Sequence, residues 1–266
     1  MLGRRTGIVG FVVALAWWLL AAAPAGAAVY NYYVDVAWTG TASGTQTEPF
    51  QTVKAALDQA NTKGAGDTSN IYVASGTYKS TLNGGLEDFG SSGLLIQARN
   101  VNLYGGYDGW DGGSGFDWVS RTPRTSVMDL TGAGTRAIDM TGNSYARPVI
   151  DGFTFQNANH TGDGGAVRLS GGFQAGGFIN DCLFVDNTTT GNGGALYISN
   201  ATAVSLVNAT FTNDTAGGSG GAIYVTVSDA LGHLYAITNG TFTLNKANGN
   251  AAEAGGGAIW AQTDTD

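Results

Sequence analysis

The feature that most constrains this chain is a unit that recurs four times between Asp151 and Gln262. Each copy has a phenylalanine, a polar turn, Gly-Gly-Ala and a short apolar run. From copy to copy the phenylalanine moves by 29, 27 and 31 residues. A period of this length is typical of solenoids, in which each repeat buries its apolar side against the next. The copies are marked by Phe155 and Gly165, Phe184 and Gly194, Phe211 and Gly221, and Phe242 and Gly257.

Alignment of the copies separates inward from outward positions. After each Gly-Gly, alternate residues are aliphatic, which is the period of a β-strand with one buried face. The predicted inward columns are Val167, Leu196, Ile223 and Ile259; Leu169, Ile198, Val225 and Ala261; Ile150, Ile179, Leu206 and Ile237; and the four phenylalanines. The fourth copy is five residues longer between Phe and Gly, which predicts an insertion around Gly249–Ala254. The pattern predicts an all-β, parallel β-helix whose coils stack in register.

Two further columns carry short polar side chains at bends. One lies three residues after the phenylalanine, and the other lies three residues before it. Such side chains bond neighbouring backbone groups and tolerate left-handed conformations. We therefore interpret them as turn residues rather than ligands. The columns are Asn187, Asp214 and Asn245, and Asp181, Asn208 and Asn239.

Composition supports a folded chain with many tight turns. Glycine accounts for 43 of 266 residues, hydrophobic residues for 43% and charged residues for only 12%. The net charge of −8 argues against a nucleic-acid partner. The single cysteine, Cys182, excludes an internal disulfide and is predicted to be a small buried hydrophobe.

Residues 1–27 have the pattern of a signal peptide. Arg4 and Arg5 precede an apolar run from Ile8 to Ala23, and Ala25-Gly26-Ala27 offers small residues for cleavage. The run is shorter than a membrane span needs. We expect a secreted bacterial protein that is extracellular or on the outer cell surface, with no membrane span in the mature chain.

The remainder, residues 28–266, is predicted to be one β-helix domain. An N-terminal cap over about 28–65 contains a strand at Tyr30–Val36 and a short amphipathic helix at Gln51–Thr62, with coils over about 70–266. A solenoid needs such a cap because its first coil otherwise exposes core and strand edges. The chain stops soon after the fourth repeat strand, so we expect a C-terminal truncation.

The motifs resemble two groups of bacterial proteins. Pro49-Phe50-Gln51-Thr52-Val53, Ile71-Tyr72-Val73 with Gly76-Thr77-Tyr78, and Leu103-Tyr104-Gly105 are similar to secreted right-handed parallel β-helix proteins of the pectate-lyase-like superfamily. The repeats resemble those of polymorphic outer membrane proteins, marked by Gly-Gly-Ala-Ile/Leu/Val and Phe-x-x-Asn. Phe155 departs, because Ala158 stands at the Asn position. The resemblance implies a right-handed β-helix used in adhesion or in glycan or partner binding.

The pectate-lyase-like resemblance also implies an alternative, a polysaccharide lyase or glycoside hydrolase. Arg121 and Pro123 begin an Arg-x-Pro-x-x-Arg motif, but Ser126 stands where its second Arg is expected. Asp181 and Asp186 are the nearest hydrolytic candidates, and neither has a convincing carboxylate partner. The two histidines, His160 and His233, are not aligned in the repeats. We therefore predict no catalytic residue, and the enzyme alternative stays open.

Two sets of aromatic residues are candidates for binding a polysaccharide or a cell-surface partner. The first is the outward column Arg168, Tyr197, Tyr224 and Trp260, which otherwise simply covers the sheet. The second is Tyr107, Trp110 and Trp118 in the excursion Gly105–Trp118, which otherwise is a packed structural loop. We expect no cofactor, although the aspartates of this excursion leave calcium open as an alternative. They are Asp108, Asp111 and Asp117. The pattern does not predict an oligomeric state.

Overall fold

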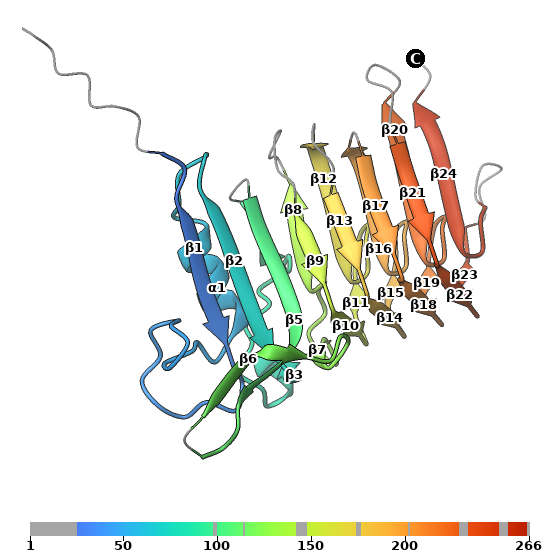
Figure 1. Cartoon of the computed structure of the whole chain (residues 1–266). Helices are drawn as coiled ribbons and strands as arrows, with labels where there is room; N and C mark the ends of the chain where they lie inside the picture. Colours follow the sequence, from blue (N-terminus) through green and yellow to red (C-terminus); the bar gives the residue numbers. More distant parts are fainter. Residues whose placement is uncertain are drawn as a thin grey trace, which may run out of the picture.

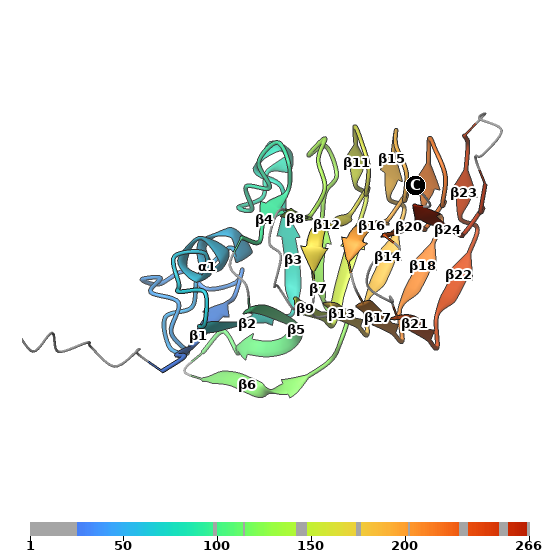
Figure 2. The ribbon, with the colours of Figure 1, turned by 90° about the horizontal axis from the view of Figure 1, so that it is seen from above.

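The protein is a right-handed parallel β-helix with one short α-helix at its start. The structure is a computed structural model and describes residues 26–97, 100–113, 115–141, 148–173, 177–201, 203–228, 234–249 and 255–264. The chain passes along sheet 1, crosses sheets 2 and 3 and returns through sheet 4 before the next coil begins (Figures 1 and 2). The predicted fold class is confirmed. Most of the predicted signal peptide, residues 1–25, lies outside the described residues, as do residues 250–254 of the predicted insertion.

From β9 onward each coil contributes one strand to each of four sheets, whereas the earlier coils contribute none to sheet 3, and neighbouring coils pair in parallel. Sheet 1 contains β1 (Val29–Val34), β2 (Thr68–Ala74), β5 (Asn100–Trp110), β9 (Val149–Asp151), β13 (Gly177–Asn180), β17 (Ala203–Val207) and β21 (Leu234–Thr238), with β6 (Phe116–Arg121) antiparallel to β5. Sheet 2 contains β3 (Gly76–Lys79), β7 (Ser126–Asp129), β10 (Phe153–Gln156), β14 (Leu183–Val185), β18 (Thr210–Thr212) and β22 (Thr241–Thr243).

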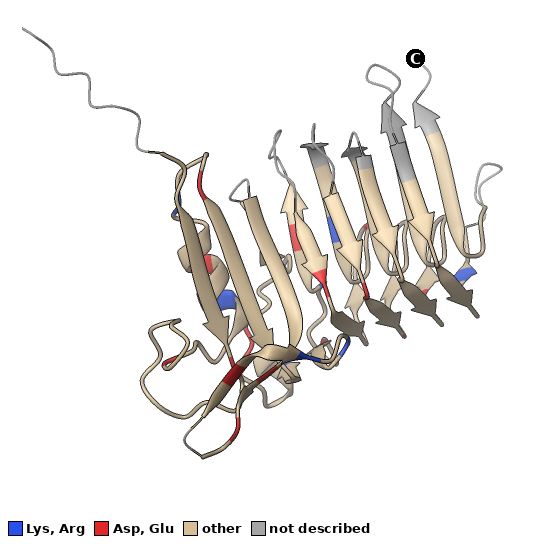
Figure 3. Cartoon of the chain, viewed as in Figure 1, with Lys and Arg blue, Asp and Glu red and all other residues tan. Residues whose placement is uncertain are grey.

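Sheet 3 is the smallest and sheet 4 completes the coil. Sheet 3 contains β11 (Asn159–His160), β15 (Thr188–Thr189), β19 (Thr215–Ala216) and β23 (Lys246–Ala247). Sheet 4 contains β4 (Leu94–Leu95), β8 (Ile138–Thr141), β12 (Val167–Phe173), β16 (Leu196–Ala201), β20 (Ile223–Ser228) and β24 (Ile259–Asp264). Charged residues are sparse along these coils (Figure 3). No helix within the described residues is long and apolar enough to cross a membrane.

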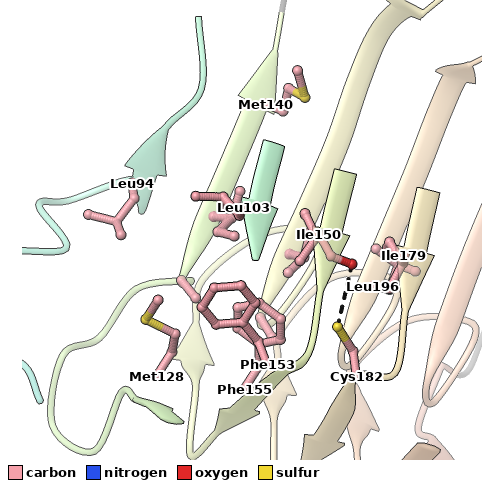
Figure 4. Packing of buried hydrophobic residues seen from close by; sticks show 14 of the residues in the cluster. Leu94, Leu103, Met128, Met140, Ile150, Phe153, Phe155, Ile179, Cys182 and Leu196 are labelled. Atoms are coloured by element: carbon pink, nitrogen blue, oxygen red, sulfur yellow. Dashed lines mark hydrogen bonds between the residues drawn. The ribbon is translucent and has the colours of Figure 1, made fainter. Parts of the chain in front are cut away.

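The core consists of the inward columns predicted from the repeats, except in the last described coil, where Ile237 and Ile259 are 43% and 37% exposed and Ala261 is exposed because no described coil covers them. Phe155, Phe184 and Phe211 are fully buried, and their ring centroids are 5.1 and 4.7 Å apart along the stack. The aliphatic columns pair in the predicted register, for example Val167 with Leu196. Cys182 is buried in this core, where its thiol donates to the Ile150 carbonyl over 3.6 Å (Figure 4). Burial raises the pKa of this thiol to about 12, so it is not a nucleophile near neutral pH.

The Gly-Gly pair recurs because both positions exclude a side chain. Gly193 has φ = 66°, a conformation that costs little only for glycine. A Cβ on Gly194 would lie 2.0 Å from the carbonyl oxygen of Gly221 in the next coil. The first glycine therefore serves the turn, and the second permits close stacking.

The two polar columns behave differently from one another. Asp181, Asn208 and Asn239 have φ between 48° and 54°, as their interpretation as left-handed bend residues predicts. In the other column the left-handed conformation falls one residue earlier, at Asn157, Asp186, Asn213 and Leu244. Asn187 and Asp214 are instead fully buried and bond to backbone groups across coils, as the bond from Asn187 Nδ2 to the Phe155 carbonyl illustrates.

The α-helix α1 (Val53–Ala60) lies against the first coil, and a short 3₁₀ turn, η1 (Thr81–Asn83), follows β3. The buried face of α1 contains Val53, Ala56, Leu57 and Ala60, as the helical spacing predicts. Glu87, from the loop after η1, accepts hydrogen bonds from the N–H groups of Val53 (2.7 Å) and Lys54 (2.9 Å). This carboxylate joins the first turn of the helix to the coil.

Candidate functional site

The outward column on sheet 4 forms a continuous stack of rings. Tyr197 and Tyr224 are 5.2 Å apart with an interplanar angle of 3°, and Tyr224 and Trp260 are 4.9 Å apart at 10°. Tyr224 is only 9% exposed. Because both faces of its ring lie against neighbouring rings, Tyr224 offers little more than a ring edge to any ligand.

An ion cluster precedes these rings in the same column. Arg168 pairs with Asp139 of β8, and both Asp139 and Arg136 are 2% exposed in their side chains. Arg136 also contacts His160 and donates to the Asp163 carbonyl. Burial, followed by the neighbouring Arg136 charge, lowers the pKa of His160 to about 4. The guanidinium of Arg168 is thus already paired with an internal carboxylate.

The excursion Gly105–Trp118 is a β-hairpin rather than an irregular loop. The second half of β5 continues out of sheet 1 and pairs with β6, and the hairpin stands in front of sheet 1 (Figure 2). Asp111 accepts from the N–H groups of Gly113 and Gly115, and Asp117 accepts from those of Val119 and Ser120. These two carboxylates serve as turn acceptors, and no group of three metal-ligating side chains occurs among the described residues.

The hairpin directs its aromatic residues to different places. Trp110 packs edge-on against Trp38 of the adjacent loop, at 5.3 Å between centroids. Trp118 instead lies edge-on to Tyr33 of β1, at 5.0 Å, and Tyr107 lies edge-on to Tyr72 of β2, at 5.5 Å. Two of the three predicted hairpin residues therefore join the outer face of sheet 1.

That outer face presents three stacked tyrosines. Tyr33, Tyr72 and Tyr104 pair in register on β1, β2 and β5, with ring centroids 5.2 and 5.7 Å apart. A parallel row of amides lies two residues earlier on the same strands, linked by hydrogen bonds of 3.0 Å from Asn70 to Asn31 and 2.8 Å from Asn102 to Asn70. We call this set the tyrosine surface: Asn31, Asn70, Asn102, Tyr33, Tyr72, Tyr104, Tyr107 and Trp118.

The tyrosine surface has hydroxyl groups without a hydrogen-bond partner in the described part of the chain. Tyr33 accepts a hydrogen bond from Gln46, but no described residue bonds to the hydroxyls of Tyr72, Tyr104 or Tyr107. Partial burial raises the pKa of all three. They therefore stay neutral near pH 7 and are able both to donate and to accept hydrogen bonds.

An ion pair closes one end of the surface. Arg121 donates to both carboxylate oxygens of Asp151, at 3.2 and 2.8 Å, and to the Gly105 carbonyl at 2.6 Å. Its guanidinium also lies 5.7 Å from the centroid of the Tyr107 ring. The pair positions the hairpin against sheet 1 and neutralises its own charge.

The carboxylates weighed for hydrolysis do not converge on this surface. Asp181 and Asp186 lie at left-handed bends, where amides of Asn180 and Asn213 bond to them. The carboxyls whose pKa values burial raises to about 7 are Glu87 and Asp214, and both are buried. His233 lies outside the described residues.

Sequence reasoning missed Tyr33, Tyr72 and Tyr104 as members of a site. The Gly-Gly-Ala repeat that revealed the later columns is absent from the first coils, so their register was not visible. One signal was present, because Tyr33-Val34 and Tyr72-Val73 share a tyrosine next to an inward valine. Aligning Tyr33 and Tyr72 with Tyr104, which follows the inward Leu103, predicts the outward tyrosine row.

Comparison with known proteins places the chain in a family. Residues 36–258 match the family described as "Protein of unknown function (DUF1565)". The chain belongs to this family. No curated protein and no solved structure matches it. The match begins after β1, so it covers β2, β5 and β6 of the tyrosine surface but not Asn31 or Tyr33.

Proposed function

We propose that this DUF1565 protein is a non-catalytic β-helix scaffold that binds a glycan on its tyrosine surface. The observation that carries the proposal is the set of three partly exposed tyrosine hydroxyls without a partner among the described residues. Hydroxyl and amide groups bond to sugar hydroxyls, and the ring edges of the stacked tyrosines add apolar contact, since Tyr72 has Tyr33 and Tyr104 on its two faces. A rigid sheet and an anchored hairpin hold these groups in place before the ligand arrives.

A non-catalytic role fits the chemistry of the same residues better than catalysis does. A general base needs a pKa near the working pH, whereas partial burial raises those of Tyr72, Tyr104 and Tyr107. Arg121 is held by Asp151 rather than free to accept or donate a proton to a substrate. The lyase or hydrolase alternative has no comparable support.

The wider setting is part of the proposal. The signal-like residues 1–27 and the repeats that resemble polymorphic outer membrane proteins support a secreted or cell-surface protein that acts in adhesion. The sheet 4 column of Arg168, Tyr197, Tyr224 and Trp260 is the alternative contact surface, in which Tyr224 is only 9% exposed and Arg168 is paired with Asp139. The experiment tests this column as the alternative binding site.

The test compares hydroxyl deletions on the two aromatic columns. Binding to a panel of linear polysaccharides is measured by calorimetry for the wild type and for two double variants, Tyr72→Phe with Tyr104→Phe and Tyr197→Phe with Tyr224→Phe. Loss of two hydrogen bonds is expected to weaken binding by about tenfold in the first variant only. Loss of binding in the second variant alone would move the site to sheet 4. Absence of binding by the wild type, or release of reducing ends or unsaturated products, would overturn the proposal.

A further inference from the structure

We infer that the glycan bound by the tyrosine surface is uncharged, and that the surface discriminates against uronates; this inference rests on the proposed function. The four strands that build the surface, β1, β2, β5 and β6, are described completely. Among their residues the only cation is Arg121, and the carboxylates are Asp108 and Asp117. The strands that carry the tyrosine and asparagine rows, β1, β2 and β5, contain almost no charged residues (Figure 3).

The one cation of these strands is already paired with an internal carboxylate. The guanidinium of Arg121 is bound by both oxygens of Asp151, which is 9% exposed, and by the Gly105 carbonyl. A uronate carboxylate would have to displace a two-point internal ion pair to reach this charge. Because Asp151 would then lose its cation and keep only the amide of Asn180 as a partner, such an exchange is disfavoured.

The groups that remain for a ligand are all neutral. They are the hydroxyls of Tyr72, Tyr104 and Tyr107 and the amide groups at the two ends of the asparagine row. Asp108 is exposed and Asp117 is partly exposed on the adjoining hairpin. A carboxylate on the ligand would lose water, gain no unpaired cation and be repelled at longer range by these exposed carboxylates, whereas a primary hydroxyl at the same place would find donors and acceptors.

The experiment uses pairs of ligands that differ in one group. A linear β-glucan, a galactan and a mannan are each compared with their C6-oxidised uronate derivatives, with the full chain at low and at moderate salt. The neutral polymer that binds is expected to bind about tenfold more tightly than its oxidised partner, since the uronate leaves a charge unpaired. Added salt is expected to narrow the gap by screening Asp108 and Asp117.

A gain-of-binding variant makes the charge argument specific. Asn102→Lys adds a cation beside Tyr104 and is expected to raise affinity for the oxidised polymer several-fold. Thr238→Lys adds the same charge at an exposed position of β21, farther along sheet 1, and is the matched control with no expected effect. Equal or tighter binding of the oxidised polymer by the wild type would overturn the inference while glycan binding stands. Binding of neither polymer would overturn both.

Discussion

At the scale of single residues, Asp214 is a carboxylate in a column of buried amides. Asn187 donates its backbone N–H and its side-chain amide to Asp214 Oδ1, and Asp214 Oδ2 is buried without a partner among the described residues. In the neighbouring coils the equivalent atom is an amide nitrogen, which donates to the carbonyl of Phe155 or of Phe211. A protonated Asp214 is able to supply the same donor toward Phe184.

This predicts a pH-dependent stability. Burial raises the pKa of Asp214 from 3.8 to about 7, although the hydrogen bonds from Asn187 act in the opposite direction and lower it. The unfolded chain releases this proton near pH 4 and the folded chain only near pH 7. The free energy of unfolding therefore falls as pH rises through this window, by up to roughly 4 kcal/mol from this group.

The variant Asp214→Asn restores the amide and removes this dependence. It is expected to unfold at a higher denaturant concentration than the wild type at pH 8, with a much smaller difference at pH 5. Asp186→Asn, at the exposed neighbouring bend, controls for the change in net charge. Denaturant melts of the three proteins at both pH values measure the effect, and a wild-type advantage at pH 8 would contradict it.

Leu244 occupies a bend where its counterparts are Asn157, Asp186 and Asn213. It has φ = 57° and is 77% exposed, so it bears a left-handed conformation without compensating burial. Leu244→Asn is expected to raise the free energy of unfolding by about 0.5–1 kcal/mol, because asparagine tolerates this conformation better. The reverse exchange, Asn213→Leu, should lower it, and thermal unfolding of both variants measures the pair. A less stable Leu244→Asn protein would refute the explanation.

At the scale of secondary-structure elements, α1 is attached to the coils by a carboxylate from another coil. Glu87 is 1% exposed and bonds the N–H groups of Val53 and Lys54. Glu87→Ala leaves both donors buried or poorly solvated and is expected to cost about 1–3 kcal/mol. Hydrogen exchange within Val53–Ala60 should accelerate more than exchange in β14 of the distant core. Thr52→Ala, which removes only a 3.3 Å bond to Ala55, is the milder comparison; a uniform response of helix and core would contradict the attachment.

The repeat made the later elements predictable and left the hairpin unpredicted. Four copies in register give inward and outward positions by comparison, which is why the phenylalanine column and the Arg168–Tyr197–Tyr224–Trp260 column were found. The β5–β6 hairpin occurs once, so no second copy reveals its pairing. Its contacts depend on Tyr33 and Tyr72, residues far away in sequence, and such long-range packing is not visible in a local pattern. The shift of the left-handed bend by one residue likewise depends on backbone geometry rather than composition.

At the scale of the whole molecule, the close approach of coils at the Gly-Gly turns couples each repeat to the next. A Cβ on Gly194 would lie 2.0 Å from the Gly221 carbonyl oxygen and 2.7 Å from Thr215 backbone atoms, and backbone on both sides leaves little room to move. In a solenoid each repeat is stabilised by stacking on its neighbours, so a steric clash at this turn weakens the stacking of two coils. Gly194→Ala is therefore expected to destabilise by about 3 kcal/mol and to let the coils on either side of it unfold separately, giving a broadened or two-step melt. Gly177→Ala, whose Cβ would find only ordinary contacts from 3.5 Å outward, should leave one transition near the wild-type temperature. Calorimetry distinguishes the two, and a single unshifted transition for Gly194→Ala would show that the coils do not depend on this contact.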